Sequence, residues 1–315
     1  MNKARYLTNL PDNKNEPFGG AFSVYDDETV NERNEAIKEF SFYPKFFNND
    51  KIRKDFLNVY KDWAFSTHKN IQGINLYNKL CFTNGTTESF SQFYLRYREN
   101  KRLRLAKGEY FYSQMMQKLW YPHNFAWLDE DKIKENDFVL LSVPFSDTGE
   151  IPDYLENMLT TCDEKNVPVM LDFAYLNLAV NFKLDVSHPC IEYIVTSLSK
   201  VFPVEHYRIG LRMQKKMFTD QIYVINEDGY NYINLLSAFI GTKLMKKFDA
   251  DFIFKKYRPK QIDMCKKYNL EVSPCVYFGI DHNNQYPLYN RGRNTNRLCF
   301  TKIWDGRMEA PNVAL

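Results

Sequence analysis

The pattern of apolar and polar positions changes along the chain. Residues 1–40 show no clear period and contain a Pro-Phe-Gly-Gly turn at 17–20, so we expect an N-terminal arm there. Apolar residues then recur at helical spacing from Ile52 to Trp63, which predicts an amphipathic helix. Beyond this helix, short apolar runs alternate with segments of helical length.

Six of these runs predict strands, and three of the segments between them predict helices. The strands are expected at 79–83, 103–106, 138–143, 167–171, 191–196 and 208–213, and the helices at 86–98, 113–120 and 152–165. Such alternation is typical of a mostly parallel sheet covered by helices on both faces. We therefore predict a three-layer α/β fold, in which ligands bind beyond the carboxyl ends of the strands.

The alternation ends after Met213, which predicts a smaller second lobe of the α+β class. Apolar residues recur at helical spacing over 231–258, so one long connecting helix is expected, and the short runs within 268–305 would form a reduced sheet. The predicted division is an arm at 1–40 that packs against the small lobe, a large domain at 41–225, and the connector helix with the small lobe at 226–315.

Composition and charge restrict the class of protein. The net charge is only +3 and charged residues make up 26%, so the chain lacks the overall field of a nucleic-acid binder. A basic cluster between Arg96 and Lys107 is expected to be a solvated helix end and an edge strand, because RNA-binding motifs are absent. No apolar run is long enough to span a bilayer and the polar start lacks a signal core, so we expect a cytoplasmic protein without membrane contact.

The cysteines indicate neither a metal site nor a disulfide framework. They are scattered, without a Cys-x-x-Cys pair or a histidine at metal-binding spacing. We expect most of them to be reduced core residues: Cys81, Cys162, Cys190, Cys265, Cys275 and Cys299.

Polar residues follow two of the predicted strands. The first strand runs into Gly85, Thr86 and Thr87, where a glycine and a helix start favour anion binding, although a threonine is more often a helix cap. The strand at 167–171 ends in Asp172, which needs a positive or hydrogen-bonding partner if buried and otherwise caps a turn.

The stretch "TSLSKVFPVEHYRIG" at 196–210 adds a further set of polar groups. Lys200 ends one predicted strand segment and Arg208 opens the next. A single lysine is most often a surface residue, since charged side chains are rarely buried unpaired. An amine, hydroxyls, a guanidinium and an acid at one sheet edge instead indicate a binding site.

Taken together, these segments resemble the aspartate aminotransferase superfamily, the fold-type I enzymes that use pyridoxal 5'-phosphate, and most closely its class I/II aminotransferases. The resemblance spans about residues 40–215. "FTNGTTES" resembles the phosphate-binding turn, "LDFAY" the Asp-x-x-Tyr pair, and "SLSKVFPVEHYRIG" the Ser-x-x-Lys segment with its downstream Arg-x-Gly. The resemblance implies that the large domain binds the cofactor and that the small lobe faces the substrate.

The resemblance also implies catalytic roles for three residues. Lys200 would form a Schiff base with the cofactor and move the proton at the substrate's α-carbon. Asp172 would pair with the pyridine nitrogen and keep it protonated. Tyr175 would hydrogen-bond the cofactor's 3-oxygen.

Further residues are implied to hold the cofactor and substrate. The phosphate would lie on the turn at Gly85 and be held by Thr86, Thr87, Ser197, Ser199 and Arg208. Tyr110 is expected to stack on the ring, with Tyr112 as the alternative, and core packing is the competing role of such tyrosines. Tyr43 resembles a tyrosine that reaches the phosphate of a neighbouring subunit, which implies a homodimer with shared active sites.

The substrate side departs from the family pattern. Arg297 resembles the arginine that grips the α-carboxylate, and Arg291 and Arg293 are nearby alternatives. Ser146 and Asp147 stand where the family has Asn and Pro, so the contact to the 3-oxygen is missing or is made by the Ser146 hydroxyl.

The expected function is a pyridoxal phosphate-dependent aminotransferase that moves an amino group between an amino acid and a 2-oxo acid. Two alternatives stay open at this point. A lyase or decarboxylase would use the same scaffold and cofactor, and a non-catalytic relative would keep the fold as a binding module. The set of Asp172, Tyr175, Lys200 and Arg208 disfavours the last, because a buried lysine beside a buried acid costs stability without a function.

Overall fold

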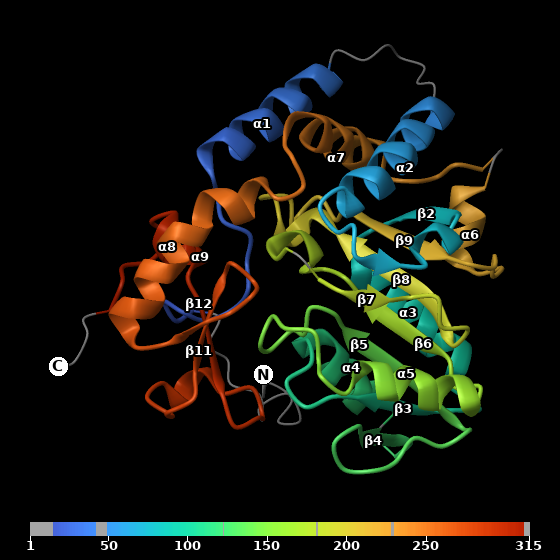
Figure 1. The fold of residues 1–315 in the computed structure, drawn as a ribbon. Helices are drawn as coiled ribbons and strands as arrows, with labels where there is room; N and C mark the ends of the chain where they lie inside the picture. Colours follow the sequence, from blue (N-terminus) through green and yellow to red (C-terminus); the bar gives the residue numbers. More distant parts are fainter. Residues whose placement is uncertain (1–14, 42–48, 122, 181, 228–229, 312–315) are drawn as a thin grey trace, which may run out of the picture.

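The computed structural model describes residues 15–41, 49–121, 123–180, 182–227 and 230–311, and it has the predicted three-layer α/β architecture (Figure 1). The main sheet consists of β2 (Lys79–Thr83), β3 (Arg102–Leu105), β4 (Phe125–Trp127), β5 (Asp137–Ser142), β6 (Val169–Asp172), β8 (Ile191–Ser197) and β9 (Gly210–Gln214). The helices that cover it include α2 (Asn49–Phe65), α3 (Thr86–Tyr97), α4 (Phe111–Trp120), α5 (Leu155–Glu164), α6 (Gln221–Asn226) and α7 (Leu235–Lys247). The six predicted strands and three predicted helices are confirmed, with β4 as an additional short strand.

Strand order determines which residues meet at the edge of the main sheet. The order is β2-β9-β8-β6-β5-β3-β4, and β9 is antiparallel to both of its neighbours while the other pairs are parallel. Gly210, at the start of β9, therefore pairs with both Thr83 and Ser197, at the ends of β2 and β8. The residues after β2 and β8 and those before β9 must consequently lie at one edge, beside the end of β6.

Alternating side chains of the strands bury both faces of the sheet. On β5, Val139 and Leu141 belong to a core cluster shared with Leu159 of α5, whereas Phe138 and Leu140 pack with Phe93 of α3. Because successive strand residues point to opposite faces, one apolar run supplies both cores.

The long helix predicted over 231–258 is wrong, because the segment is divided. It forms α7 and then α8 (Phe252–Tyr268), and between them Phe248 adopts an extended backbone. The Trp63 indole donates a hydrogen bond to the free Phe248 carbonyl, and the Phe248 ring packs on Phe202 and Phe252. Tertiary contacts therefore support the break that helical periodicity alone does not reveal.

The segment expected to be an arm also contains α1 (Asp27–Ser41), a helix that the lack of a clear period did not indicate. Its first turn is fixed by Asp26, whose Oδ1 accepts the Glu28 and Thr29 amides. Figure 1 shows α1 beside α7, above the main sheet. Upstream of the helix, residues 19–26 run as irregular chain toward the small lobe.

The C-terminal lobe is a small antiparallel sheet with adjacent helices. β10 (Glu271–Val272), β11 (Phe278–Asp281) and β12 (Asn296–Cys299) form it, with α8 and α9 (Thr301–Trp304) alongside. Phe18 packs edge-on against Tyr268 and Phe300, and its carbonyl accepts the Cys299 amide. A short parallel pair, β1 (Ile71–Gln72) and β7 (Leu184–Asp185), completes the strands of the described chain.

The expectation for the basic cluster is confirmed at the helix end, where Arg96 and Arg98 are exposed, and is wrong for the strand. β3 is not an edge strand, because it lies between β4 and β5, and Arg104 is fully buried. Its guanidinium donates to Asp137 and to the carbonyls of Ala126 and Lys132, so its charge is compensated inside the protein. Among the described residues, no helix is long and apolar enough to cross a bilayer.

Candidate active site

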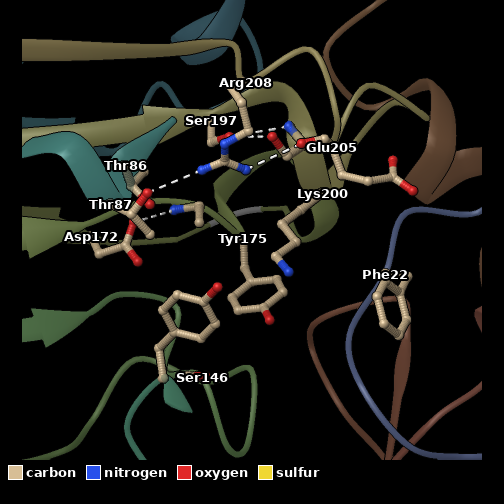
Figure 2. Close-up of a pocket in the computed structure, with 13 residues that line it drawn as sticks. Phe22, Thr86, Thr87, Ser146, Asp172, Tyr175, Ser197, Lys200, Glu205 and Arg208 are labelled. Atoms are coloured by element: carbon tan, nitrogen blue, oxygen red, sulfur yellow. Dashed lines mark hydrogen bonds between the residues drawn. The ribbon is translucent and has the colours of Figure 1, made fainter. Parts of the chain in front are cut away.

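A cavity of about 180 Å³ opens where the ends of β2, β6 and β8 meet the start of β9 (Figure 2). It is lined by Phe22, Thr86, Thr87, Tyr110, Ser146, Asp172, Ala174, Tyr175, Ser197, Ser199, Lys200, Glu205 and Arg208. The antiparallel β9 brings Arg208 to the same edge as the strand-end residues. The segments singled out in the sequence thus converge on one cavity.

One side of the cavity is a preformed anion site. Gly85 is the N-cap of α3, with φ 78° and no side-chain cap hydrogen bond, so neither following threonine caps this helix. A Cβ built at Gly85 would lie 2.3 Å from Arg208 Nη2, which explains the need for glycine. Arg208 itself has φ 56° and donates from Nη2 to Thr87 Oγ1 at 3.1 Å. A guanidinium at a helix N-terminus favours a phosphate-like group.

Two serines complete this side. Ser197 is the last residue of β8, and its hydroxyl accepts the Ser199 amide at 3.1 Å while donating toward Ile209 O at 3.1 Å. The two serine hydroxyls lie 3.0 Å apart. Backbone groups next to β8 and β9 therefore hold the Ser197 hydroxyl, which in turn contacts the Ser199 hydroxyl.

Asp172, the last residue of β6, is the acid of the cavity. Burial raises the pKa of Asp172 to about 8, the negative charge of Glu109 adds to the rise, and the Ala174 amide and Lys200 oppose it. The Ala174 amide donates to Oδ1 at 3.1 Å, so the carboxyl also closes a turn as an aspartate at this position often does. A cation placed beside Asp172 would restore its ionised form.

Lys200 follows β8 in a short 3₁₀ turn, Leu198–Lys200. Its Nζ donates to Ala21 O at 2.5 Å and lies 5.7 Å from the Tyr110 ring and 5.8 Å from the Tyr175 ring. Burial, together with the neighbouring Arg297 guanidinium, lowers the pKa of Lys200 to about 8. About a tenth of this amine is thus neutral and nucleophilic at pH 7, far more than for an ordinary lysine.

Of the two candidate tyrosines after β3, the structure brings only Tyr110 to the cavity lining. The Tyr112 hydroxyl instead lies 2.9 Å from Ser91 Oγ of α3. Tyr175 also lines the cavity, and Figure 2 shows the Lys200 amine directed toward its ring. Burial raises the pKa of Tyr175, so its hydroxyl stays a hydrogen-bond donor.

The three candidate arginines of the small lobe separate in the structure. Arg297 of β12 is buried, donates from Nη1 to Ser146 O at 2.5 Å and lies over the Phe278 ring at 4.6 Å. Arg291 is half-buried and donates to Ser146 Oγ at 3.4 Å, whereas Arg293 is exposed over Phe145. None of the three is among the described residues that line the cavity, but Arg291 and Arg297 contact Ser146, which does line it, whereas Arg293 packs on Phe145.

Some lining residues could not be recognised in the sequence. Phe22 and Glu205 line the cavity from the N-terminal segment and from the loop after Lys200. Glu205 accepts hydrogen bonds from the Tyr25 and Ser23 hydroxyls, which fixes that segment across the site. Long-range pairing of this kind leaves no local pattern. Tyr43 lies outside the described residues.

Comparisons with known proteins agree with this geometry. Residues 103–252 match the family described as aminotransferase class I and II. The fold is similar to a probable N-succinyldiaminopimelate aminotransferase from Thermus thermophilus, with TM-score 0.62, 13% identity, and 90% of this chain and 89% of that chain covered. A histidinol-phosphate aminotransferase from Clostridium acetobutylicum gives TM-score 0.58, 16% identity, and coverage of 92% and 98%.

A third similar structure carries out a different reaction on the same fold. It is a pyridoxal phosphate-bound C–S lyase from Staphylococcus hominis, with TM-score 0.63, 11% identity, and 93% of this chain and 86% of that chain covered. A comparison with curated proteins finds no match. The chain thus has the fold of these solved structures, and its central segment, less than half of its length, matches the aminotransferase class I and II family.

Proposed function

We propose that the protein transfers an amino group between an amino acid and a 2-oxo acid, with Lys200 carrying the pyridoxal 5'-phosphate. The observation that carries this proposal is the convergence of Lys200, Asp172 and Arg208 on one cavity. Each group suits one part of the cofactor. The amine can condense with the aldehyde, the buried acid can pair with the ring nitrogen, and the guanidinium can bind the phosphate.

The described residues fit this cofactor. The glycine cradle at Gly85, the start of α3 and the Arg208 guanidinium supply an anion site for the phosphate. Burial raises the pKa of the Asp172 carboxyl, so its ionised form needs a cation beside it. A protonated ring nitrogen would be that cation. When bound, pyridoxal phosphate supplies a ring that stabilises negative charge at the substrate's α-carbon.

The chain's own residues then position the substrate and move its proton. Lys200 has a pKa of about 8, so its amine can accept the proton from the α-carbon and return one at the next step. Arg297, fixed by Ser146 O and by the Phe278 ring, offers its guanidinium to the α-carboxylate. Phe22 and the tyrosines of the lining limit the access of water.

The proposal is tested by a spectrum and a peptide map. Protein incubated with pyridoxal phosphate should show a visible absorption band that borohydride abolishes, and digestion should then yield the cofactor on the peptide containing Lys200. Lys200→Ala should show neither result. A Lys200→Ala protein that still turned over amino acids would refute the assignment.

A lyase or decarboxylase is the alternative reaction, and the C–S lyase similar in fold motivates it. The departures at Ser146 and Asp147 lie on the substrate side, where reaction choice is determined. Analysis of products after incubation with amino acids, for 2-oxo acid, ammonia and carbon dioxide, distinguishes the reactions. Conversion of the bound cofactor to its amine form is expected for transamination alone.

We also propose a homodimer in which Tyr43 of one subunit reaches the active site of the other. In an equimolar mixture, Lys200→Ala and Tyr43→Ala subunits would form one intact site per mixed dimer. With random pairing, about a quarter of the wild-type activity should return. Two inactive variants that recover nothing on mixing, although sedimentation shows exchange of subunits, would rule out the shared site.

A further inference from the structure

Asp147 is a buried acid on the substrate side whose carboxylate the proposed reaction does not use. Its side chain is fully buried, and neither carboxylate oxygen accepts a hydrogen bond from any residue that the structure describes. It directly follows Ser146, which lines the cavity. An unpartnered buried carboxylate is costly unless cations compensate it, so its surroundings indicate its role.

The surroundings of Asp147 are three arginines of the small lobe. Arg291 is the nearest, with Nε 3.4 Å from Oδ1. Burial raises the pKa of Asp147, and the guanidiniums of Arg291, Arg297 and Arg293 oppose the rise. The acid is therefore held against a cationic cluster rather than against a hydrogen-bond donor.

Arg291 is held in place through one of its nitrogens and faces Asp147 with another. Its Nη2 lies 3.3 Å from Gly108 O, 3.1 Å from Glu109 O and 3.4 Å from Ser146 Oγ, whereas its Nε is paired in charge with Asp147. The buried Glu109 carboxyl adds negative potential near this guanidinium. Within the described chain, Arg297 donates only to Ser146 O, so its guanidinium keeps capacity to bind a carboxylate.

We infer that Asp147 is a specificity-determining residue that neutralises Arg291, so that the site accepts amino acids with one carboxylate and disfavours dicarboxylic ones. This inference rests on the proposed function of Arg297 as the α-carboxylate site. A second substrate carboxylate near Ser146 would find the charge of Arg291 already offset by the buried Asp147, in place of a free guanidinium. The aromatic lining of Phe22, Tyr110 and Tyr175 suits an uncharged side chain instead.

The test compares two unreactive acids of equal chain length, pentanoate and glutarate, which differ in the second carboxylate. Binding is measured by titration calorimetry on protein loaded with pyridoxal phosphate. The wild-type protein should bind pentanoate more tightly than glutarate. Asp147→Asn, which keeps the shape and removes the charge, should bind glutarate on the order of tenfold more tightly than wild type and leave pentanoate nearly unchanged.

The matched control is Asp153→Asn, which removes an exposed carboxylate six residues later and should change neither affinity. The double variant Asp147→Asn/Arg291→Gln should lose the gain for glutarate, because the guanidinium that Asp147→Asn sets free is then removed. The ratio of kcat/KM for glutamate to that for phenylalanine should rise in Asp147→Asn in the same proportion. Unchanged glutarate binding in Asp147→Asn, or a wild-type preference for glutarate or for lysine as donor, would overturn the inference.

Misfolding of Asp147→Asn would not leave the question open. Arg291→Gln alone leaves Asp147 without its nearest cation, so glutarate binding should weaken more than pentanoate binding, and an unchanged ratio would contradict the inference. Failure of the proposed function has a different signature. It would appear as the absence of a cofactor band in wild type, whereas failure of this inference would appear as a normal band with unchanged acid selectivity.

Discussion

The two sides of the cavity are built in different ways. The side proposed for the cofactor consists of residues at or next to strand ends, namely Asp172 and Ser197, with Arg208 held just before β9. The side proposed for the substrate is assembled from segments far apart in sequence, because Ser146 meets Arg297 and Lys200 meets Ala21. Strand register fixes the first side, and packing between lobes fixes the second.

This difference indicates that one side of the cavity binds the cofactor and that the other determines the substrate and the reaction. The strand-end side has defined donors at a helix start, and its geometry follows from β9 lying between β2 and β8. On the substrate side, Ser146 and Asp147 follow β5 and lie outside the main sheet, so they can be substituted without disturbing its strand pairing. Substitutions on the two sides should therefore affect different measurements.

The largest effect is expected from Lys200→Arg. This change keeps a cation but removes the amine that accepts a proton, so kcat should fall by about 10³-fold or more. The affinity for pyridoxamine 5'-phosphate, which needs no bond to lysine, should change far less. Lys215→Arg is the matched control, since Lys215 donates to the carbonyls of Ser187 and His188 away from the cavity. Equal losses of turnover and cofactor affinity in Lys200→Arg would contradict the separation of the two sides.

A smaller loss is expected from Asp172→Asn. The amide oxygen can still accept the Ala174 amide, but the negative charge is lost, so turnover should fall by about 10²-fold. Asp185→Asn is the control, because Asp185 accepts the Ser187 amide in the same turn geometry outside the cavity. Steady-state turnover rates of both variants test this prediction. A wild-type rate in Asp172→Asn would contradict the proposed pairing of Asp172 with the ring nitrogen.

The same distinction explains what the sequence could predict. Strand ends follow from apolar runs, so the positions of Gly85, Asp172 and Lys200 were predictable, and parallel strands bring such ends to one edge. The break between α7 and α8 was not predictable, since the Trp63 contact that supports it comes from 185 residues away. Phe22, Glu205 and the pairing of Asp147 with Arg291 likewise depend on contacts between segments far apart in sequence. The burial of Arg104 depends on carbonyls of the short strand β4 and of the turn after it, which no periodicity predicts.

The two sides of the cavity meet at Lys200. The pH dependence of the rate at which Lys200 reacts with the cofactor therefore tests how the substrate side affects the cofactor side. The pKa of Lys200 is lowered to about 8, so its neutral, reactive fraction rises with pH and levels off above this value. The initial rate of band formation with pyridoxal phosphate should increase about tenfold from pH 7 to 9. Arg297→Gln removes a repelling charge, so the pKa of Lys200 should rise and the midpoint should move to higher pH.

Arg293→Gln is the control for that shift, because Arg293 is exposed and belongs to the same segment. In this variant, the midpoint of the pH dependence of band formation should equal that of the wild-type protein. Stopped-flow absorbance over the pH range supplies the measurement. A midpoint in Arg297→Gln equal to or below that of wild type would show that the small-lobe guanidinium does not act on Lys200.

The smallest effect is expected from Gly85→Ala, compared with Gly306→Ala. Both glycines have positive φ, 78° and 72°, so both alanines should lower the free energy of unfolding by about 1 kcal/mol. Only at Gly85 would the new Cβ press on Arg208, since no described residue lies within 4 Å of a Cβ at Gly306. Urea unfolding should therefore give similar losses, whereas the Kd for pyridoxal phosphate should rise severalfold in Gly85→Ala alone. An unchanged Kd in Gly85→Ala would mean that Arg208 can move away without cost, and the strand-end side would then be less rigid than its hydrogen bonds indicate.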